Sequence, residues 1–294
     1  MNQRNRRVFA LAALLLALLT GLSACQLKTA EPFQLGLSPN RRVIKGDGNL
    51  VTRTTQLRDS EPYTLEVNGV SFQWSQAKHA VDIVIDETLP RGVTMTADGN
   101  IADSIAISCN AARRVIAIQP REKLILTPTR LEIRVGAPIE KLVLNGPWDF
   151  SYNCPSVARC EIALNGAADG DMTFGKLDQL RLDINGAGDL TLNGAATQAT
   201  INVNGAGSVS AFGLNAEHAT IAINGAGDCE ITALQTLSAE INGLGDVTYH
   251  GSPRVTKTIH GLGNIHAGGR DEEAGDRETG GRDEETGDRG MGVR

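Results

Sequence analysis

Aromatic side chains are scarce in this sequence, since tryptophan, tyrosine and phenylalanine make up only 4% of its 294 residues. This scarcity argues against a sandwich core built on large rings, although an apolar content of 41% is too high for a wholly disordered chain. Basic residues are also outnumbered, because 28 Lys and Arg face 34 Asp and Glu, for a net charge of −6. Nucleic-acid-binding proteins favour basic patches, so we expect no nucleic acid partner.

Recognisable catalytic motifs are missing as well. The sequence contains no Gly-x-Ser-x-Gly nucleophile motif, no phosphate-binding loop, and no Cys-x-x-Cys or His-x₃-His spacing of the kind that binds zinc. We therefore predict a protein that is not an enzyme and that carries no cofactor and no metal ion.

The N-terminus is typical of a bacterial signal peptide. Three arginines among the first seven residues precede an apolar run over residues 8–19, which is too short to span a bilayer comfortably. The motif Leu22-Ser23-Ala24-Cys25 follows and resembles a lipobox. We expect cleavage of residues 1–24, lipid on the Cys25 thiol, and anchoring in the membrane by several acyl chains such as palmitate.

The sequence predicts a folded body over residues 43–267, with a segment outside the fold at each end of the mature chain. Residues 25–42 hold two prolines and little periodicity, which predicts a tether. Gln26 follows the lipid-bearing cysteine, and under the enteric sorting rule a residue other than Asp favours the outer membrane. Residues 268–294 repeat a charged Gly-Arg-Asp-Glu-Glu segment with almost no apolar residues, which predicts a disordered tail.

An internal repeat dominates the body. An aliphatic residue followed by Asn-Gly recurs at spacings of 18 to 20 residues, and a seventh copy has His260 in place of Asn. Such a period predicts a solenoid. The repeated asparagines are Asn145, Asn165, Asn185, Asn204, Asn224 and Asn242.

The segments between the corners alternate apolar and polar residues, as in Leu180, Leu182 and Ile184, and this period of two predicts strands. No segment is long or periodic enough for a helix, which disfavours leucine-rich, ankyrin and tetratricopeptide repeats. We therefore predict an all-β fold, a single-stranded parallel β-helix with coils of 18–20 residues. The coils are regular over residues 144–267 and irregular over residues 43–143.

The corners are predicted to be structural. Stacked asparagines can hydrogen-bond from coil to coil, and glycine within a strand makes sense where the backbone needs a positive φ. We expect that conformation at Gly186, Gly205 and Gly225, and we assign the same corner role to Gly243.

Residues 43–267 resemble the family of auto-transporter adhesin head GIN domains. The resemblance rests on the opening Gly46-Asp47-Gly48-Asn49, on Asn-Gly-Ala-Gly-Asp corners such as Asn185 to Asp189, and on the closing run from Gly251 to Lys257. The sequence departs from the family pattern in two ways: it has Asn at most corners where Ser is commoner, and large side chains thicken the coil around Trp148. The resemblance implies a right-handed β-helix in a bacterial envelope protein, and it implies little about mechanism.

The irregular region contains two further features. Asp98-Gly99-Asn100 lies between two short strands and predicts a tight turn. Phe72 and Trp74 are expected to cover the exposed end of the solenoid, as terminal repeats require, or alternatively to line a ligand pocket.

The remaining cysteines, acidic residues and histidines suggest little chemistry. Cys154 and Cys160 are close enough in sequence for a disulfide, whereas Cys229 takes a core position. Asp149, Asp169, Asp189, Asp228 and Asp246 could line one edge as calcium ligands, but the motif recurs too rarely for a calcium roll. His250, His260 and His266 lie near the C-terminal coils and are expected to be surface residues.

Three functions stay open. The first is an adhesin-like envelope module that binds an extracellular glycan or matrix protein. The second is a calcium-dependent polysaccharide lyase or hydrolase, and the third is a passive structural or stress-related envelope protein. For the first, we expect the binding face to be the outward side of the strands before the corners, although Thr and Ser also suit strands for their own sake. That face contains Thr200, Asn202, Thr220, Ala222, Ser238, Thr256 and Thr258.

Overall fold

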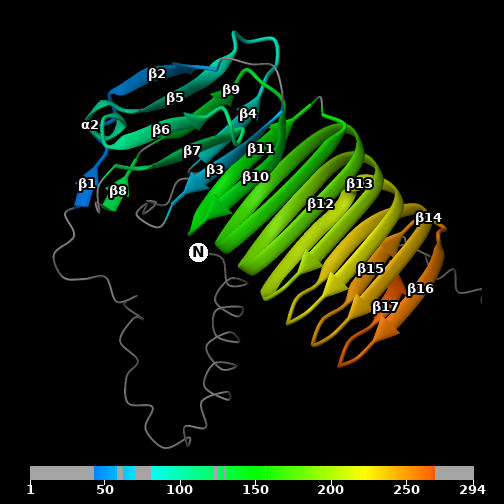
Figure 1. Cartoon of the computed structure of the whole chain (residues 1–294). Coiled ribbons are helices and arrows are strands. Elements are labelled where there is room, and N and C mark those ends of the chain that lie inside the picture. Colours follow the sequence, from blue (N-terminus) through cyan, green and yellow to red (C-terminus); the bar gives the residue numbers. More distant parts are fainter. Residues whose placement is uncertain are drawn as a thin grey trace, which may run out of the picture.

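The computed structural model describes residues 43–57, 62–69, 81–121, 125–128, 130–155 and 157–268. Most of these residues lie in strands, which form one 15-stranded sheet and one two-stranded sheet. The large sheet winds into an elongated stack of coils whose N-terminal end is less regular (Figure 1). Within these described ranges, no helix has the length and apolarity needed to cross a membrane.

Several predicted features lie outside the described residues. They are the signal peptide over residues 1–24 with its lipobox, Cys25 and the tether up to residue 42, the aromatic pair Phe72 and Trp74, and the charged tail from residue 269.

The regular coils contain eight strands. These are β10 (Ile139–Asn145), β11 (Trp148–Cys154), β12 (Arg159–Val203), β13 (Ala206–Ile223), β14 (Cys229–Ile241), β15 (Val247–His250), β16 (Arg254–Ile259) and β17 (Ile265–Ala267). β12 and β13 are long because the chain stays extended through the corners of successive coils.

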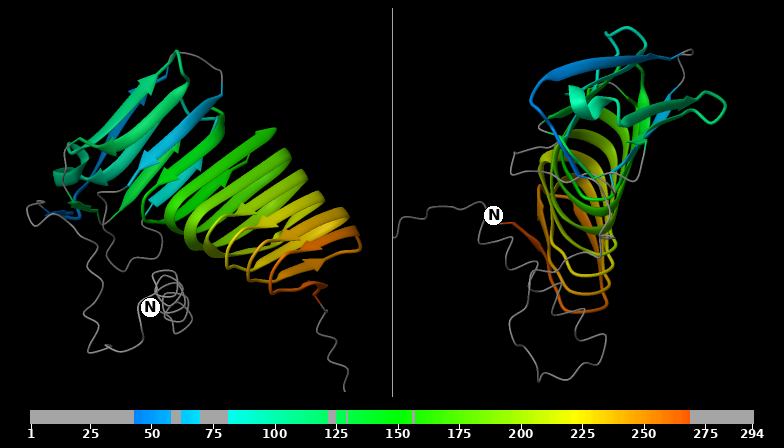
Figure 2. Two further views of the ribbon diagram at one scale, coloured as in Figure 1. Left: turned by 60° about the horizontal axis from the view of Figure 1, so that its bottom comes forward. Right: turned by 90° about the vertical axis from the view of Figure 1, so that its left-hand side faces the viewer.

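Neighbouring coils pair in parallel, with each residue beside its equivalent one repeat later. Ile201 of β12 pairs with Ile221 of β13, which pairs with Ala239 of β14. Equivalent residues are therefore about 4.8 Å apart along the stack, and Figure 2 shows the coils side by side along one axis. The predicted fold, an all-β, right-handed parallel β-helix with coils of 18–20 residues, is confirmed.

The core is a continuous column of aliphatic side chains inside the coils. Alternate strand residues point inward, and each inward residue stacks on those of the neighbouring coils. Burial of one such side chain contributes about 1.5–3 kcal/mol, but only when neighbouring coils cover it, so the stack is stable as a whole. The middle position of the strand before the corner is filled in turn by Leu65, Leu142, Ile162, Leu182, Ile201 and Ile221, all buried.

The N-terminal region adds nine strands and one short helix. The elements are β1 (Val43–Lys45), β2 (Leu50–Gln56), β3 (Tyr63–Asn68), β4 (Val81–Ile85), β5 (Gly92–Asp98), α2 (Gly99–Ala102), β6 (Ile105–Asn110), β7 (Val115–Pro120), β8 (Ile125–Thr127) and β9 (Leu131–Val135). β3, β4, β7 and β9 continue the parallel stack, whereas β2–β5, β5–β9 and β6–β7 are antiparallel pairs.

This region corrects two expectations. Irregular coils do not account for all of residues 43–143, since three of the strand pairs there are antiparallel. The sequence did not predict this, because alternation of apolar residues identifies a strand without fixing the direction of its partner. The tight turn expected at Asp98-Gly99-Asn100 is instead the helix α2, and the next strand, β6, pairs with β7 and not with β5.

The opening glycines of the body enclose a buried carboxylate. The backbone N–H of Gly48 donates to Oδ1 of Asp98 over 2.8 Å, and Asp98 is fully buried. A Cβ atom on Gly46 would lie 2.4 Å from the Asp98 carboxyl carbon, so only glycine fits there. Burial of a charge is costly unless donors surround it, and this segment supplies one of those donors.

Candidate functional site

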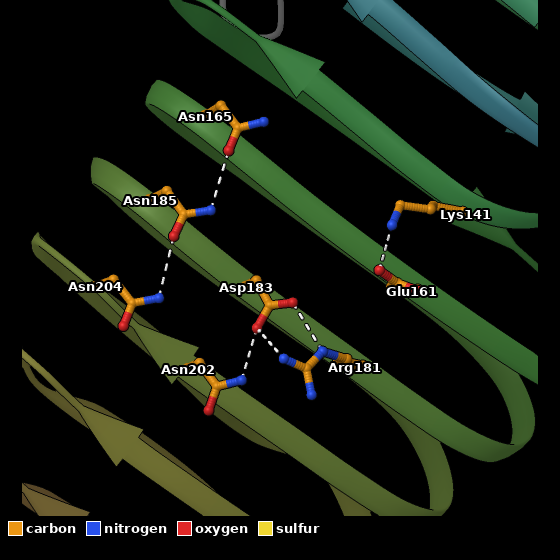
Figure 3. Close-up of polar contacts among 8 residues, drawn as sticks. All are labelled: Lys141, Glu161, Asn165, Arg181, Asp183, Asn185, Asn202 and Asn204. Atoms are coloured by element: carbon orange, nitrogen blue, oxygen red, sulfur yellow. Dashed lines mark hydrogen bonds and ion pairs between the residues drawn. The ribbon is translucent and has the colours of Figure 1, made fainter.

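The corner asparagines form one continuous hydrogen-bonded ladder. The Nδ2 atom of each asparagine donates to Oδ1 of the asparagine one coil earlier, over 2.8 to 3.1 Å (Figure 3). The ladder begins at Asn68 in the N-terminal region and ends at Asn242. Because these amide groups bond to one another, they hold the corners in register and are not presented as a binding site.

The corner glycines are required by close packing of the backbone. The expected positive φ is present at Gly186 and Gly225, whose φ angles are 158° and 156°, near the extended region. It is absent at Gly205, so the expectation is wrong for that residue. A Cβ atom on Gly205 would instead lie 2.0 Å from the carbonyl oxygen of Gly186 in the preceding coil. At these glycine positions, successive corners stack too tightly for a side chain.

The outward side chains of the strand segments before each corner form a flat surface, here called the upstream face. Its residues lie in two rows, in which neighbours belong to adjacent coils. The first row is Lys141, Glu161, Arg181, Thr200, Thr220, Ser238 and Thr256, and the second is Val143, Ala163, Asp183, Asn202, Ala222, Glu240 and Thr258. All seven residues of the predicted binding face therefore lie on this one face: Thr200, Asn202, Thr220, Ala222, Ser238, Thr256 and Thr258.

The upstream face changes character along the stack. Near β10 it carries an ion pair between Lys141 and Glu161, whose charged atoms are 2.5 Å apart. One coil further, Arg181 donates two hydrogen bonds to Asp183, over 2.8 and 3.0 Å. Asn202 also donates to Asp183, over 2.6 Å (Figure 3). Beyond this network the rows consist mainly of small hydroxyl side chains.

A groove of about 500 Å³ opens at the charged end of the upstream face. It reaches from the turn between β6 and β7 across β3 and β10 to the first coils of β12. Among the described residues that line it, cationic side chains outnumber carboxylates by five to two, although the whole chain is acidic. The charged residues that line it are Arg113, Arg114, Lys141, Arg159, Arg181, Glu140 and Glu161.

The aspartates after the corners bond to the backbone of the next coil in two separate stretches, with Ser208 between them. Oδ1 of Asp169 accepts the backbone N–H of Asp189, and Oδ1 of Asp228 accepts the backbone N–H of Asp246, each over 2.9 Å. Burial, together with the charges of Asp189 and Asp149, raises the pKa of Asp169. The carboxylates thus bond to backbone, and among the described residues no three His, Cys, Asp or Glu side chains are grouped to hold a metal ion.

The cysteines differ from expectation at one pair. Cys154 and Cys160 are both buried and are free thiols, so the structure does not contain the predicted disulfide. They are inward residues that contact Tyr152, whose hydroxyl lies 3.9 Å from Sγ of Cys160. A hydrogen bond to Cys154 and burial raise the pKa of Cys160. Cys229 is a core residue, and its complete burial raises its thiol pKa to about 12.

The C-terminal histidines do not gather into a site. The ring of His250 stacks on Phe212 with centroids 3.9 Å apart, whereas Nε2 of His266 is 3.4 Å from the Thr248 hydroxyl and His260 is exposed at a corner.

Sequence reasoning identified the upstream face and missed the groove. In the sequence, Arg181 is an isolated charged residue among mostly neutral outward positions, and Arg113 lies far from it along the chain. The available signal was the spacing of Lys141, Glu161 and Arg181 at one repeat each, which places three charges on adjacent coils.

Comparison with solved structures supports the fold. A protein described as a "putative adhesin" from Bacteroides fragilis matches with a TM-score of 0.55 and 18% identity, over 76% of this chain and 99% of its own. A "putative lipid binding protein" from Parabacteroides distasonis matches with a TM-score of 0.53 and 22% identity, over 78% of this chain and all of its own. No match was found among curated proteins.

The family itself follows from the sequence of the stack. A family model described as "Putative auto-transporter adhesin, head GIN domain" matches residues 72–253, which is more than half of the chain and includes most of the parallel coils. The protein therefore belongs to the adhesin head GIN domain family.

Proposed function

We propose that this protein is a non-catalytic, adhesin-like binding module of the bacterial envelope, anchored through lipid on Cys25 in the outer membrane. The upstream face carries the proposal, because its two rows repeat small hydrogen-bonding groups about every 4.8 Å. A surface of this kind offers many weak contacts and no deep pocket, which suits an extended or repetitive ligand.

Membrane anchoring complements such a surface. Many copies held on one membrane can engage a repetitive ligand together, so weak single contacts add up to firm attachment. The lipobox-like run Leu22-Ser23-Ala24-Cys25 supports the anchor, and membership of the adhesin head family supports display at the surface.

The anchor is tested with labelled palmitate. Wild type and Cys25→Ser are expressed in the native host, and the label is expected only in wild type, which should fractionate with the membrane. Equal label in both proteins, or a soluble wild type, would refute the anchor and leave the binding face to be tested by itself.

The binding face is tested by attachment of cells to surfaces coated with glycans or matrix proteins. The triple variant Thr200→Lys, Thr220→Lys and Thr258→Lys should lose most attachment, because the long charged side chains interrupt the rows. The matched control is Thr173→Lys, Thr191→Lys and Thr248→Lys, on the strands after the corners. If both variants attach like wild type and keep their circular dichroism spectra, the threonines serve only strand formation and solubility.

A further inference from the structure

We propose that the groove at the charged end of the upstream face binds a short stretch of an acidic glycan through its arginines. The inference rests on the proposed binding function and names its ligand class and its point of strongest contact.

Two arginines of the groove are available to an incoming anion. Arg113 and Arg159 are exposed, and neither side chain has an ion-pair partner among the residues described. Lys141 and Arg181 are already paired with Glu161 and Asp183, so they shape the site without offering a full free charge. The planar guanidinium group donates two parallel hydrogen bonds to a carboxylate, sulfate or phosphate, which makes free arginines a strong anion site.

The backbone beneath the groove holds one arginine in an unfavourable conformation. Arg114 has a φ of 53°, the left-handed region that Gly or Asn adopts more easily. Its carbonyl oxygen accepts the backbone N–H of Thr64 over 2.8 Å, which fixes the turn between β6 and β7 beside β3. Local strain of this kind concentrates at functional sites, and here it places two consecutive arginines at the rim of the groove.

The groove extends over several strands, so it is long enough for a segment of a polymer and is not limited to a single ion. Thr64, Lys141 and Glu161 lie on three adjacent strands in register, and Arg181 follows one repeat later. Three strand spacings amount to about 14 Å. Arg181 also belongs to the first row of the upstream face, so a polymer bound in the groove could continue along the threonines.

The other side chains of the groove favour a sugar over other polyanions. Glu140, Glu161, Gln179 and Thr64 provide acceptors, which sugar hydroxyl groups require and which a phosphate or sulfate alone does not. Single-stranded nucleic acid binds by stacking on aromatic rings, whereas Tyr63, the one aromatic residue among the described residues that line this groove, is 1% exposed.

Binding is measured on the purified Cys25→Ser chain with five probes. Polygalacturonate carries carboxylates and dextran sulfate carries sulfates, whereas neutral dextran, polyglutamate and single-stranded DNA are the comparisons. We expect the first or the second to bind, more weakly as salt rises, and this pair of probes distinguishes which anion is preferred. In Arg113→Gln/Arg159→Gln the affinity should fall about tenfold or more.

The matched control Arg91→Gln/Arg254→Gln removes the same charge from two exposed arginines outside the groove and should bind like wild type. An equal loss in both double variants, or equally tight binding of polyglutamate or DNA, would overturn the proposal by showing general attraction of polyanions. If neither polygalacturonate nor dextran sulfate binds, while cells still attach through the threonine rows, the proposed glycan site in the groove is refuted and the binding function of the upstream face is not. Loss of attachment and of all glycan binding would overturn the proposed function as well.

Discussion

The Nζ atom of Lys257 donates a hydrogen bond to the carbonyl oxygen of Ile265, 2.5 Å away, across the last coil of the stack. Lys257 pairs with Ala239, so it occupies the inward position that Ile201 and Ile221 fill in earlier coils. Its ammonium group also lies 5.8 Å from the ring centroid of Tyr249. The conspicuous lysine of the closing motif therefore places a charge inside the open end of the β-helix.

We predict that Lys257→Leu makes the protein associate through this end. An inward charge protects an open strand edge from pairing with other chains, and leucine would present an apolar edge instead. Light scattering after size-exclusion chromatography should show larger species than for wild type. Arg254→Leu, which alters an outward residue of the same strand, is the control, and identical behaviour of the two variants would contradict the capping role.

Gly205→Val should destabilise the middle of the stack by about 3 kcal/mol or more, because the added side chain overlaps the carbonyl oxygen of Gly186 and the backbone cannot move aside. Gly213→Val is the control. Its nearest atom would be Oδ1 of Asn193, the end of a side chain that can rotate away, so its cost should be much smaller. Urea unfolding followed by circular dichroism measures both, and equal midpoints would show that close packing is not the reason for glycine at this corner.

Asp169→Asn should raise the melting temperature at pH 7 and leave it unchanged at pH 3. The pKa of Asp169 is raised in the folded protein, so folding favours its protonated form and stability is lost as the pH rises through the carboxyl range. Asparagine keeps an acceptor for the Asp189 N–H without the charge. The residue is exposed as a whole and its carboxylate is only half-buried, so the rise is small, about 1 °C. A difference between variant and wild type that is the same at both pH values would exclude ionisation as its cause.

Thiol labelling at pH 8 should modify only Cys109 in the folded Cys25→Ser chain. Cys109 is exposed, whereas Cys154, Cys160 and Cys229 are buried. With a pKa of about 12, roughly one Cys229 in ten thousand would be a thiolate at this pH even if the reagent could enter. In denaturant, four cysteines should react, and Cys109→Ser should abolish labelling of the folded protein. Only two reactive thiols in denaturant would show that Cys154 and Cys160 form a disulfide after all.

The regular half of the fold could be predicted because each coil repeats the same local sequence pattern. A period of two before the corner, an Asn-Gly pair and a spacing of 18 to 20 residues together determine which residues stack, without knowledge of any distant partner. The N-terminal half carries the same alternation but no repeat, so nothing in the sequence showed that β5 would lie antiparallel between β2 and β9.

The candidate site divides in the same way. Thr200 and Thr220 could be placed on one face because they are one repeat apart. Arg113 and Arg159 could not be placed together, since the first lies in a turn of the irregular region and the second begins β12. Their proximity depends on how β7 stacks on β3, and β3 on β10, which only the structure reveals.

The parallel register has a consequence for the evolution of this protein. Because each regular coil contacts only its two neighbours, gain or loss of one repeat between Gly186 and Gly243 would lengthen or shorten the molecule by about 4.8 Å and leave the groove intact. The number of threonine contacts available to a polymer can therefore change in unit steps while the chemistry at its charged end stays the same. Related proteins of different length would then differ in how much of a polymer they hold, and not in which polymer they choose.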